Sequence, residues 1–187
     1  MKRKNKRSYD AEGTRGRILD VAARAFQTTG YHATSMHDVM RLADVPGGSL
    51  YYYFPTKKSL GLAVISERVG LEVEQTWLHP IRTASSAAAG IAAVFDAVAD
   101  GAERGRRVSG CPVNNLTLEL ASGDRDFQRA LGAVFDTWKN GIAACLGDDA
   151  LAAFIVAAFS GAMSLAKASQ SAEPIRACKR HIERLLD

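Results

Sequence analysis

The chain has 187 residues, 47% of them hydrophobic, and is long enough to bury a core of its own. Its 24 basic and 20 acidic side chains leave a formal net charge of only +4, which by itself does not indicate a nucleic-acid partner. No apolar run looks long and pure enough to span a membrane, and no hydrophobic signal core follows Met1, so we expect a cytoplasmic protein. The three cysteines are too few for a disulfide framework and lack zinc-motif spacing, so we expect no metal and no other cofactor.

The positive charge is concentrated near the N-terminus. Residues 1–60 carry 11 basic and 5 acidic side chains, whereas residues 61–187 carry 13 basic and 15 acidic ones. A basic N-terminal segment of this kind is suited to face phosphates. Five of the six residues from Lys2 to Arg7 are basic, and we expect residues 1–12 to form a flexible arm that can still touch a DNA groove or backbone.

The first predicted helix begins at Thr14, a residue type that favours helix N-caps, and ends near Gly30. Its apolar face has helical spacing and consists of Ile18, Leu19, Ala22, Ala25 and Phe26. Arg15 and Arg17, near the start of this helix, either face phosphates or are ordinary surface charges.

Two short helices joined by a tight turn follow. Ser35 is suited to cap the first of them, and the segment from Asp44 to Gly47 interrupts it, because Pro and Gly disfavour a continuing helix. The second is predicted from about Gly48 to Phe54. This arrangement is typical of a helix-turn-helix whose second helix reads DNA. Its small core is predicted to consist of Val39, Ala43, Val45 and Leu50.

A family resemblance rests on the same stretch. The run Gly48-Ser49-Leu50-Tyr51-Tyr52-Tyr53-Phe54, followed by Lys57 and Leu60, closely resembles the DNA-binding head of TetR-type transcriptional regulators. The matching positions before it are Ala22-Ala23-Arg24-Ala25-Phe26 and Gly30-Tyr31. The match covers residues 14–62, about a quarter of the chain. A helix-turn-helix period alone is common, but this ordered aromatic run with its downstream Lys is not.

The candidate DNA contacts lie in and beside the two short helices. They are Thr34, Ser35, Gly47, Gly48, Ser49, Tyr51, Tyr52, Tyr53 and Lys57. A helix N-terminus with hydroxyls suits a phosphate, although capping alone would explain Ser35. Successive tyrosines on a helix point about 100° apart, so one or two of the three must face the protein. The resemblance implies that Lys57 contacts a phosphate; the alternative is a solvated lysine.

The rest of the chain reads as helix throughout. We expect a long connecting helix from Lys57 to Trp77, ended by His79-Pro80, and helices over 84–102, 111–121 and 124–146, then from Asp148 onward and over 174–186. Strand alternation is not apparent. The predicted fold is therefore all-α with about nine helices: a three-helix DNA-binding head over residues 13–56 and a helical bundle over 57–187 for ligand binding and dimerisation.

The last two predicted helices carry heptad-like apolar stripes, which favour pairing with a second copy in a four-helix bundle. The stripe residues are Leu151, Ile155, Phe159, Ile175, Cys178, Ile182 and Leu185. The resemblance also implies a homodimer, while the alternative is that these stripes only face the core of one chain. Cys178 and His181 lie one turn apart, but no further metal ligand is near them in sequence.

A second, shorter resemblance concerns the ligand-binding part. The run Gly110-Cys111-Pro112-Val113-Asn114-Asn115-Leu116, with Glu119-Leu120, Gly161-Ala162 and Lys167-Ala168, resembles a TetR subset with a Gly-Cys signature. Some members of that subset are associated with reactive electrophiles or small unsaturated acids. Cys111 at a helix N-terminus after Arg106 and Arg107 is placed to form a reactive thiolate; the alternative is a small buried core residue. The other candidate effector-site residues are Phe95, Asn115, Phe127, Trp138 and Lys167.

Two rival functions remain to be weighed. An enzyme with a Cys nucleophile needs a neighbouring base, and His32, His37, His79 and His181 are not placed by sequence beside Cys111. A nonspecific architectural DNA binder is the other rival. We expect a dimeric one-component regulator rather than an enzyme, more specifically a repressor released from a palindromic operator in double-stranded DNA by a small molecule or a thiol-reactive electrophile.

Overall fold

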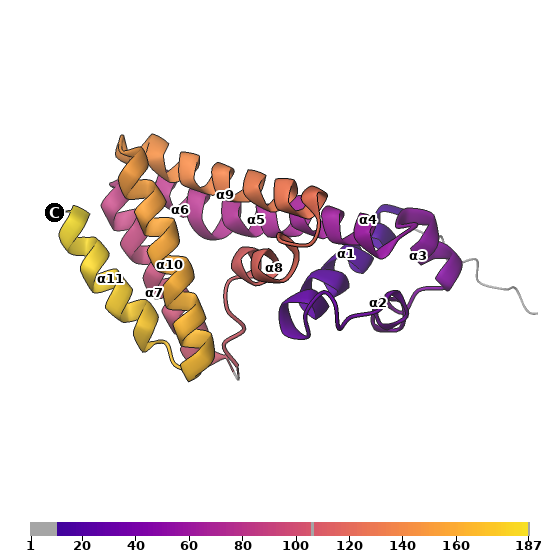
Figure 1. Cartoon of the computed structure of the whole chain (residues 1–187). Helices are drawn as coiled ribbons and strands as arrows, with labels where there is room; N and C mark the ends of the chain where they lie inside the picture. Colours follow the sequence, from indigo (N-terminus) through magenta and orange to yellow (C-terminus); the bar gives the residue numbers. More distant parts are fainter. Residues whose placement is uncertain (1–10, 106, 187) are drawn as a thin grey trace, which may run out of the picture.

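The computed structural model describes residues 11–105 and 107–186, and every regular element in this part of the chain is helical. The expected arm lies almost wholly outside the described residues, as does Arg106. The head consists of α1 (Ala11–Thr28), α2 (Met36–Ala43) and α3 (Gly47–Tyr53), which gather at one end of the molecule (Figure 1). A long helical rod follows, and α1 packs against its beginning.

The rod is made of five segments that follow one another without interruption. They are α4 (Lys57–Val64), η1 (Ile65–Val69), α5 (Gly70–Val73), η2 (Glu74–Leu78) and α6 (His79–Thr83). The two η segments are π-helical turns, which are rare and usually occur as single turns within α-helices. The rod runs from the head into the body, and α9 lies along it (Figure 1).

The body is completed by α7 (Ala87–Arg104), α8 (Pro112–Leu120), α9 (Arg125–Leu146), α10 (Asp149–Ser169) and α11 (Glu173–Leu186). With the rod counted as one helix, the described residues form nine helices, as the sequence predicted. The helices α7, α10 and α11 pack together at the end opposite the head, and α8 lies between the two ends (Figure 1).

Several predicted helix ends are confirmed by side-chain caps. Ser35, Asp124 and Asp148 each accept a backbone N–H at a helix start, and Gly147 ends α9 with a left-handed φ of 71°. Two predictions were wrong. Thr14 is not an N-cap, because α1 begins at Ala11 and Thr14 is buried within it.

The connecting helix also does not end at His79-Pro80. It continues to Thr83, with Pro80 in the first turn of α6 directly after the second π turn. Proline's fixed φ is compatible with a helix, and its missing N–H removes only one backbone hydrogen bond. The N–H of His79 bonds instead to the carbonyl of Glu74, five residues back. The π-helical turn η2 therefore lies directly before Pro80, where the proline cannot donate the usual α-helical hydrogen bond.

The body is packed around an aromatic cluster. The ring centroids of Trp77 and Phe159 are 4.7 Å apart, those of Trp77 and Trp138 are 5.0 Å apart, and Phe95 contacts both Trp77 and Phe159 edge-on. These rings come from the rod and from α7, α9 and α10, so they join four helices that are distant in sequence. Edge-to-face aromatic pairs of this kind stabilise beyond the area they bury.

Most of the predicted dimer stripe faces the core of its own protomer. Ile155, Phe159, Ile175 and Ile182 are buried, Leu151 and Cys178 are half-buried, and Leu185 is 54% exposed. For the four buried residues the packing agrees with the alternative interpretation of the stripe, because α11 packs on α7 and α10 within one chain. The exposed side of α10 carries a different apolar set.

By length and composition alone, α10 is also apolar enough to cross a membrane, with a mean hydropathy of 1.7, so the sequence expectation that no segment reaches this level was wrong. It is the one such helix among the described residues, and it packs between α9 and α11.

Candidate nucleic-acid interface and effector cavity

The geometry between α2 and α3 is fixed by caps and by a small core. The hydroxyl of Ser35 accepts the N–H of Asp38 at 3.0 Å, and the carboxylate of Asp38 accepts the N–H of Ser35. Asp44 ends α2 in a left-handed conformation with φ 50°. The four residues predicted as the core, Val39, Ala43, Val45 and Leu50, are all buried. These contacts hold α3 against α1 and α2 and leave its other side open.

The three tyrosines of α3 separate as their helical spacing requires. Tyr52 is 79% exposed and Tyr51 is 54% exposed, whereas Tyr53 is half-buried and packs on the core. At the start of α3, a Cβ added to Gly48 would meet nothing within 4 Å, so the surface beside Gly48 is open. Gly47 and Ser49 are half-buried, and Ser35 is exposed at the start of α2. The open surface of α3 therefore combines a small residue with two phenols.

Two predicted phosphate contacts are engaged within the protein. Thr34 is buried and its hydroxyl donates to the carbonyl of Gly30 at 2.7 Å. The ammonium of Lys57 donates to the carbonyl of His32 at 3.2 Å and lies 4.4 Å from the ring centroid of Tyr31, and partial burial lowers its pKa. In this conformation both side chains hold the loop between α1 and α2.

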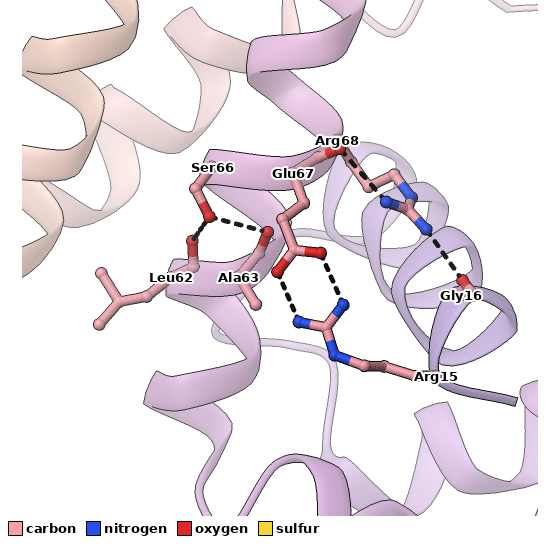
Figure 2. Close-up of polar contacts among 7 residues, drawn as sticks. All are labelled: Arg15, Gly16, Leu62, Ala63, Ser66, Glu67 and Arg68. Atoms are coloured by element: carbon pink, nitrogen blue, oxygen red, sulfur yellow. Dashed lines mark hydrogen bonds and ion pairs between the residues drawn. The ribbon is translucent and has the colours of Figure 1, made fainter. Parts of the chain in front are cut away.

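Arg15 is likewise bonded within the protein, and it connects the head to the rod. Figure 2 shows its guanidinium donating to both carboxylate oxygens of Glu67, at 2.6 and 2.5 Å, and these bonds lower the pKa of Glu67. Beside it, Arg68 donates to the carbonyl of Gly16 at 3.3 Å and to Asp20 at 2.7 Å. These bonds of Arg15 and Arg68 connect α1 with η1, so they hold the first π turn against the head. Arg17 is exposed.

A second connection between head and body is made by α8. The carboxylate of Glu119 accepts the backbone N–H groups of Tyr31 at 2.9 Å and His32 at 2.6 Å. Gly30 precedes them with φ 100°, and a Cβ there would lie 3.4 Å from the Glu119 oxygens. Glycine is the residue that adopts this φ without strain. The α1–α2 loop therefore presents two donors to one carboxylate of the body.

A polar network extends this junction. The amide of Gln27 donates to the carbonyl of Gly110 at 2.7 Å, and the amide of Asn115 donates to Gln27 at 3.0 Å and to the carbonyl of Ser109 at 2.8 Å. Lys167 of α10 donates to Asn115 at 3.1 Å. The residues of the Gly-Cys signature thus lie against α1. The sequence pointed to Asn115 and Lys167 as effector contacts but gave no sign of Gln27.

A cavity of about 80 Å³ lies in the body between the rod, α8, α9 and α10. Its walls are mainly apolar and include Val73, Trp77, Val113, Trp138 and Phe159. A neighbouring hollow of about 200 Å³ lies between α1, the rod and α8, and the two share Val69, Glu72 and Pro112. The rod and α8 therefore border the cavity and also hold the head.

Cys111 lines the cavity, but its chemistry differs from the thiolate predicted. The residue is buried at the start of α8, and burial raises the pKa of its thiol to about 11. Desolvation outweighs the backbone N–H groups of Val113 and Asn114, which lower the pKa. The helix N-terminus therefore does not suffice to form a thiolate, and the structure favours the alternative of a core cysteine.

Of the six predicted effector-site residues, Cys111 and Trp138 line the cavity. Phe95 is buried behind it in the aromatic cluster. Phe127 packs on Tyr31 of the head with ring centroids 5.2 Å apart, and so belongs to the junction. Asn115 and Lys167 also belong there. Apolar periodicity marked Phe127 as inward-facing, but it could not tell which partner the ring meets.

Comparisons with known proteins agree with this architecture. Residues 18–64 match the family described as "Bacterial regulatory proteins, tetR family", and residues 87–181 match "Transcriptional regulator LmrA/YxaF-like, C-terminal domain". An uncharacterized HTH-type transcriptional regulator in the lacX 3′ region of Lactococcus lactis is 29% identical over 135 residues, covering 72% of this chain and 69% of the relative. The HTH-type transcriptional repressor DhaR of a Mycobacterium species is 23% identical over 181 residues, 86% of each chain.

A solved structure extends the match over the whole fold. A TetR transcriptional regulator from Chloroflexus aurantiacus is 27% identical, with a TM-score of 0.79 over 93% of this chain and 94% of that one. The helix-turn-helix, the rod and the helical body are thus shared in sequence and in arrangement. The chain belongs to the TetR family of DNA-binding transcriptional regulators.

Proposed function

We propose that this protein is a ligand-responsive repressor that acts in the cytoplasm, binds a palindromic operator as a homodimer, and leaves it when a small molecule occupies the cavity of the body. The observation that carries this proposal is that one pair of elements, the rod and α8, borders the cavity and also holds the head. Because the thiol of Cys111 is buried and protonated, we propose a reversible ligand rather than a thiol-reactive electrophile.

The second copy is assigned to the exposed side of α10. This side carries a stripe of apolar residues at helical spacing: Ala153, Phe154, Ala157, Gly161, Leu165 and Ala168. Phe154 is 50% and Leu165 is 63% exposed, and Leu185 of α11 is also exposed. An apolar patch of this kind on a soluble protein marks an association surface, and its small residues permit close approach of a second helix.

The coupling between the sites requires a ligand that prefers one arrangement of the head over the other. A ligand in the cavity contacts Pro112 and Val113 at the start of α8, while Glu119 near its end holds the α1–α2 loop. A shift of α8 as a rigid helix therefore moves two backbone hydrogen bonds of the head. Two such heads in a dimer must meet successive major grooves about 34–36 Å apart, so a small displacement breaks the register.

The proposal is tested by selection from random duplex DNA with the purified full chain. We expect the enriched sequence to be an inverted repeat, because a two-fold symmetric dimer presents two equivalent heads. Tyr52→Ala, at an exposed reading position, should weaken binding to the enriched site, whereas Leu118→Ala, equally exposed on α8, should not. Enrichment of a direct repeat or of no sequence would refute the proposal.

A further inference from the structure

The chemistry of the cavity is asymmetric in charge. Among the residues that the structure describes, its lining contains one acidic side chain, Glu72, and no lysine, arginine or histidine. Arg24 and Arg68 line the neighbouring hollow and not the cavity, and Lys167, whose side chain lies close to Gly110 of the lining, donates to Asn115. Arg68 is held by Asp20 and by the carbonyl of Gly16. The charge presented to a molecule in the cavity is therefore negative.

Glu72 has no partner for that charge in the described part of the chain. In residues 11–105 and 107–186, its carboxylate makes neither a hydrogen bond nor an ion pair, unlike Glu67 and Glu74 on the same rod, which are held by Arg15 and Arg82. Although the residue is exposed toward the hollow, desolvation raises the pKa of its carboxyl. A cation placed beside it would remove that penalty.

The walls favour the same kind of molecule. Trp77, Trp138 and Phe159 line the cavity, and the negative π faces of aromatic rings attract cations, above all where water is excluded. The thiol of Cys111 is protonated at neutral pH and adds no charge.

The volume limits the part of the ligand that enters. About 80 Å³ is roughly half of the ~150 Å³ apolar cavity that accommodates a benzene molecule. A group of a few heavy atoms therefore fits, and the neighbouring hollow, which shares Glu72 with the cavity, offers space for a larger portion.

We propose that the effector is an organic cation, a protonated or quaternary amine, whose charged group lies beside Glu72 and whose apolar substituents contact Trp77 and Trp138. This inference rests on the proposed function, because it names the chemical class of the molecule that the effector cavity takes. Carboxylates and other anions are excluded from the cavity by the same charge.

The test uses three probes of similar shape and different charge: tetramethylammonium, tert-butanol and trimethylacetate. Trp77 and Trp138 are the two tryptophans of the chain, and both line the cavity, so intrinsic fluorescence of the unaltered protein reports binding there. We expect saturable binding of tetramethylammonium and at least about tenfold weaker binding of the neutral and anionic probes, the ratio that corresponds to about 1.4 kcal/mol. Equal or tighter binding of trimethylacetate or tert-butanol would overturn the proposal.

Two matched variants test whether the carboxylate of Glu72 is the group that binds the cation. Glu72→Gln should weaken tetramethylammonium binding at least about tenfold and leave tert-butanol binding unchanged. Glu74→Gln removes a carboxylate of the same rod that is paired with Arg82 and does not line the cavity, so it should bind like the unaltered chain. Unchanged binding by Glu72→Gln contradicts the proposal. If that variant fails to fold, the three probes on the unaltered protein still decide.

Measuring whether each compound releases the operator DNA distinguishes a failure of this inference from a failure of the proposed function. If cations bind in the cavity and the operator complex is unaffected by any of them, the ligand class stands and the effector role fails. If a neutral or anionic compound that binds in the cavity releases the operator, the effector role stands and the ligand class fails.

Discussion

The carboxylate of Glu119 holds the head to the body through two backbone N–H groups. Hydrogen bonds to a charged group contribute about 1.5–3 kcal/mol each, more than neutral ones. Gln at this position keeps one acceptor and places an amide donor against the second N–H. We therefore expect Glu119→Gln to lower the free energy of unfolding by about 1–3 kcal/mol, measured by urea denaturation.

The control for this prediction is Glu173→Gln on α11, whose carboxylate pairs with Arg180 at the surface. Exposed ion pairs contribute little, so its stability should change by less than about 1 kcal/mol. Equal stability of Glu119→Gln and the unaltered chain would show that α8 does not anchor the α1–α2 loop.

Cys111 provides a pH-dependent prediction. Because burial raises the pKa of its thiol to about 11, the thiol stays protonated at neutral pH, and the thiolate is the form that reacts. The other two cysteines of the chain are Cys145 and Cys178. When both are replaced by serine, alkylation of Cys111 by iodoacetamide should be slow at pH 7. Its rate should rise about tenfold per pH unit as the thiolate fraction rises. Fast labelling at pH 7, followed by mass spectrometry, would contradict this account.

At the scale of elements, the packing between head and body leaves no room for a side chain at Gly61 of α4. A Cβ there would lie 2.7 Å from a ring carbon of Tyr31 and 3.0 Å from the ring of Phe127. Gly61→Ala should therefore destabilise the chain by about 1–3 kcal/mol, because these rings must shift. Gly132→Ala in α9 meets nothing within 4 Å and should stabilise by about 0.5–1 kcal/mol, since alanine favours helix.

Thermal unfolding of both variants checks this prediction. Opposite shifts of the melting temperature support the close packing of α4 on the α1–α2 loop. Equal shifts in the same direction would mean that the interface relaxes around the added methyl group.

Local chemistry predicted the helix-turn-helix well. The cap at Ser35, the turn at Asp44–Gly47 and the buried Leu50 are each specified by residues within one or two turns of one another. The same holds for the ends of α9 and α10. Contacts that join distant segments were not predictable: the bond from Gln27 to Gly110 spans 83 residues and has no periodic signature.

The stripe on α10 shows why periodicity alone does not predict a dimer interface. This helix is apolar on nearly every side, so the pattern does not say which side faces its own protomer and which faces a partner. Ile155 and Phe159 turned inward, because α9 and α11 cover that side. The exposed side, with Phe154 and Leu165, became visible only from the packing. Local sequence also predicted the wrong helix end at Pro80. The rod continues through this proline although its missing N–H removes one backbone hydrogen bond.

At the scale of the whole molecule, the exposed side of α10 makes the proposed dimer testable. Leu165→Glu places a charge within that face and should yield monomers in size-exclusion chromatography with light scattering, because burying an unpaired charge is costly. Leu118→Glu, at a position 75% exposed on α8, should leave the mass unchanged. A Leu165→Glu variant with the mass of the unaltered dimer would place the interface elsewhere.

The head and the body together predict a protein that distinguishes one duplex sequence from others. The most direct measurement is a competition titration of the full chain on its enriched inverted repeat, against a scrambled duplex of equal length, at several salt concentrations. We predict a preference of at least about 10³-fold at physiological salt, with both affinities falling as salt rises. Equal affinity for the two duplexes, even at low ionic strength, would contradict the account.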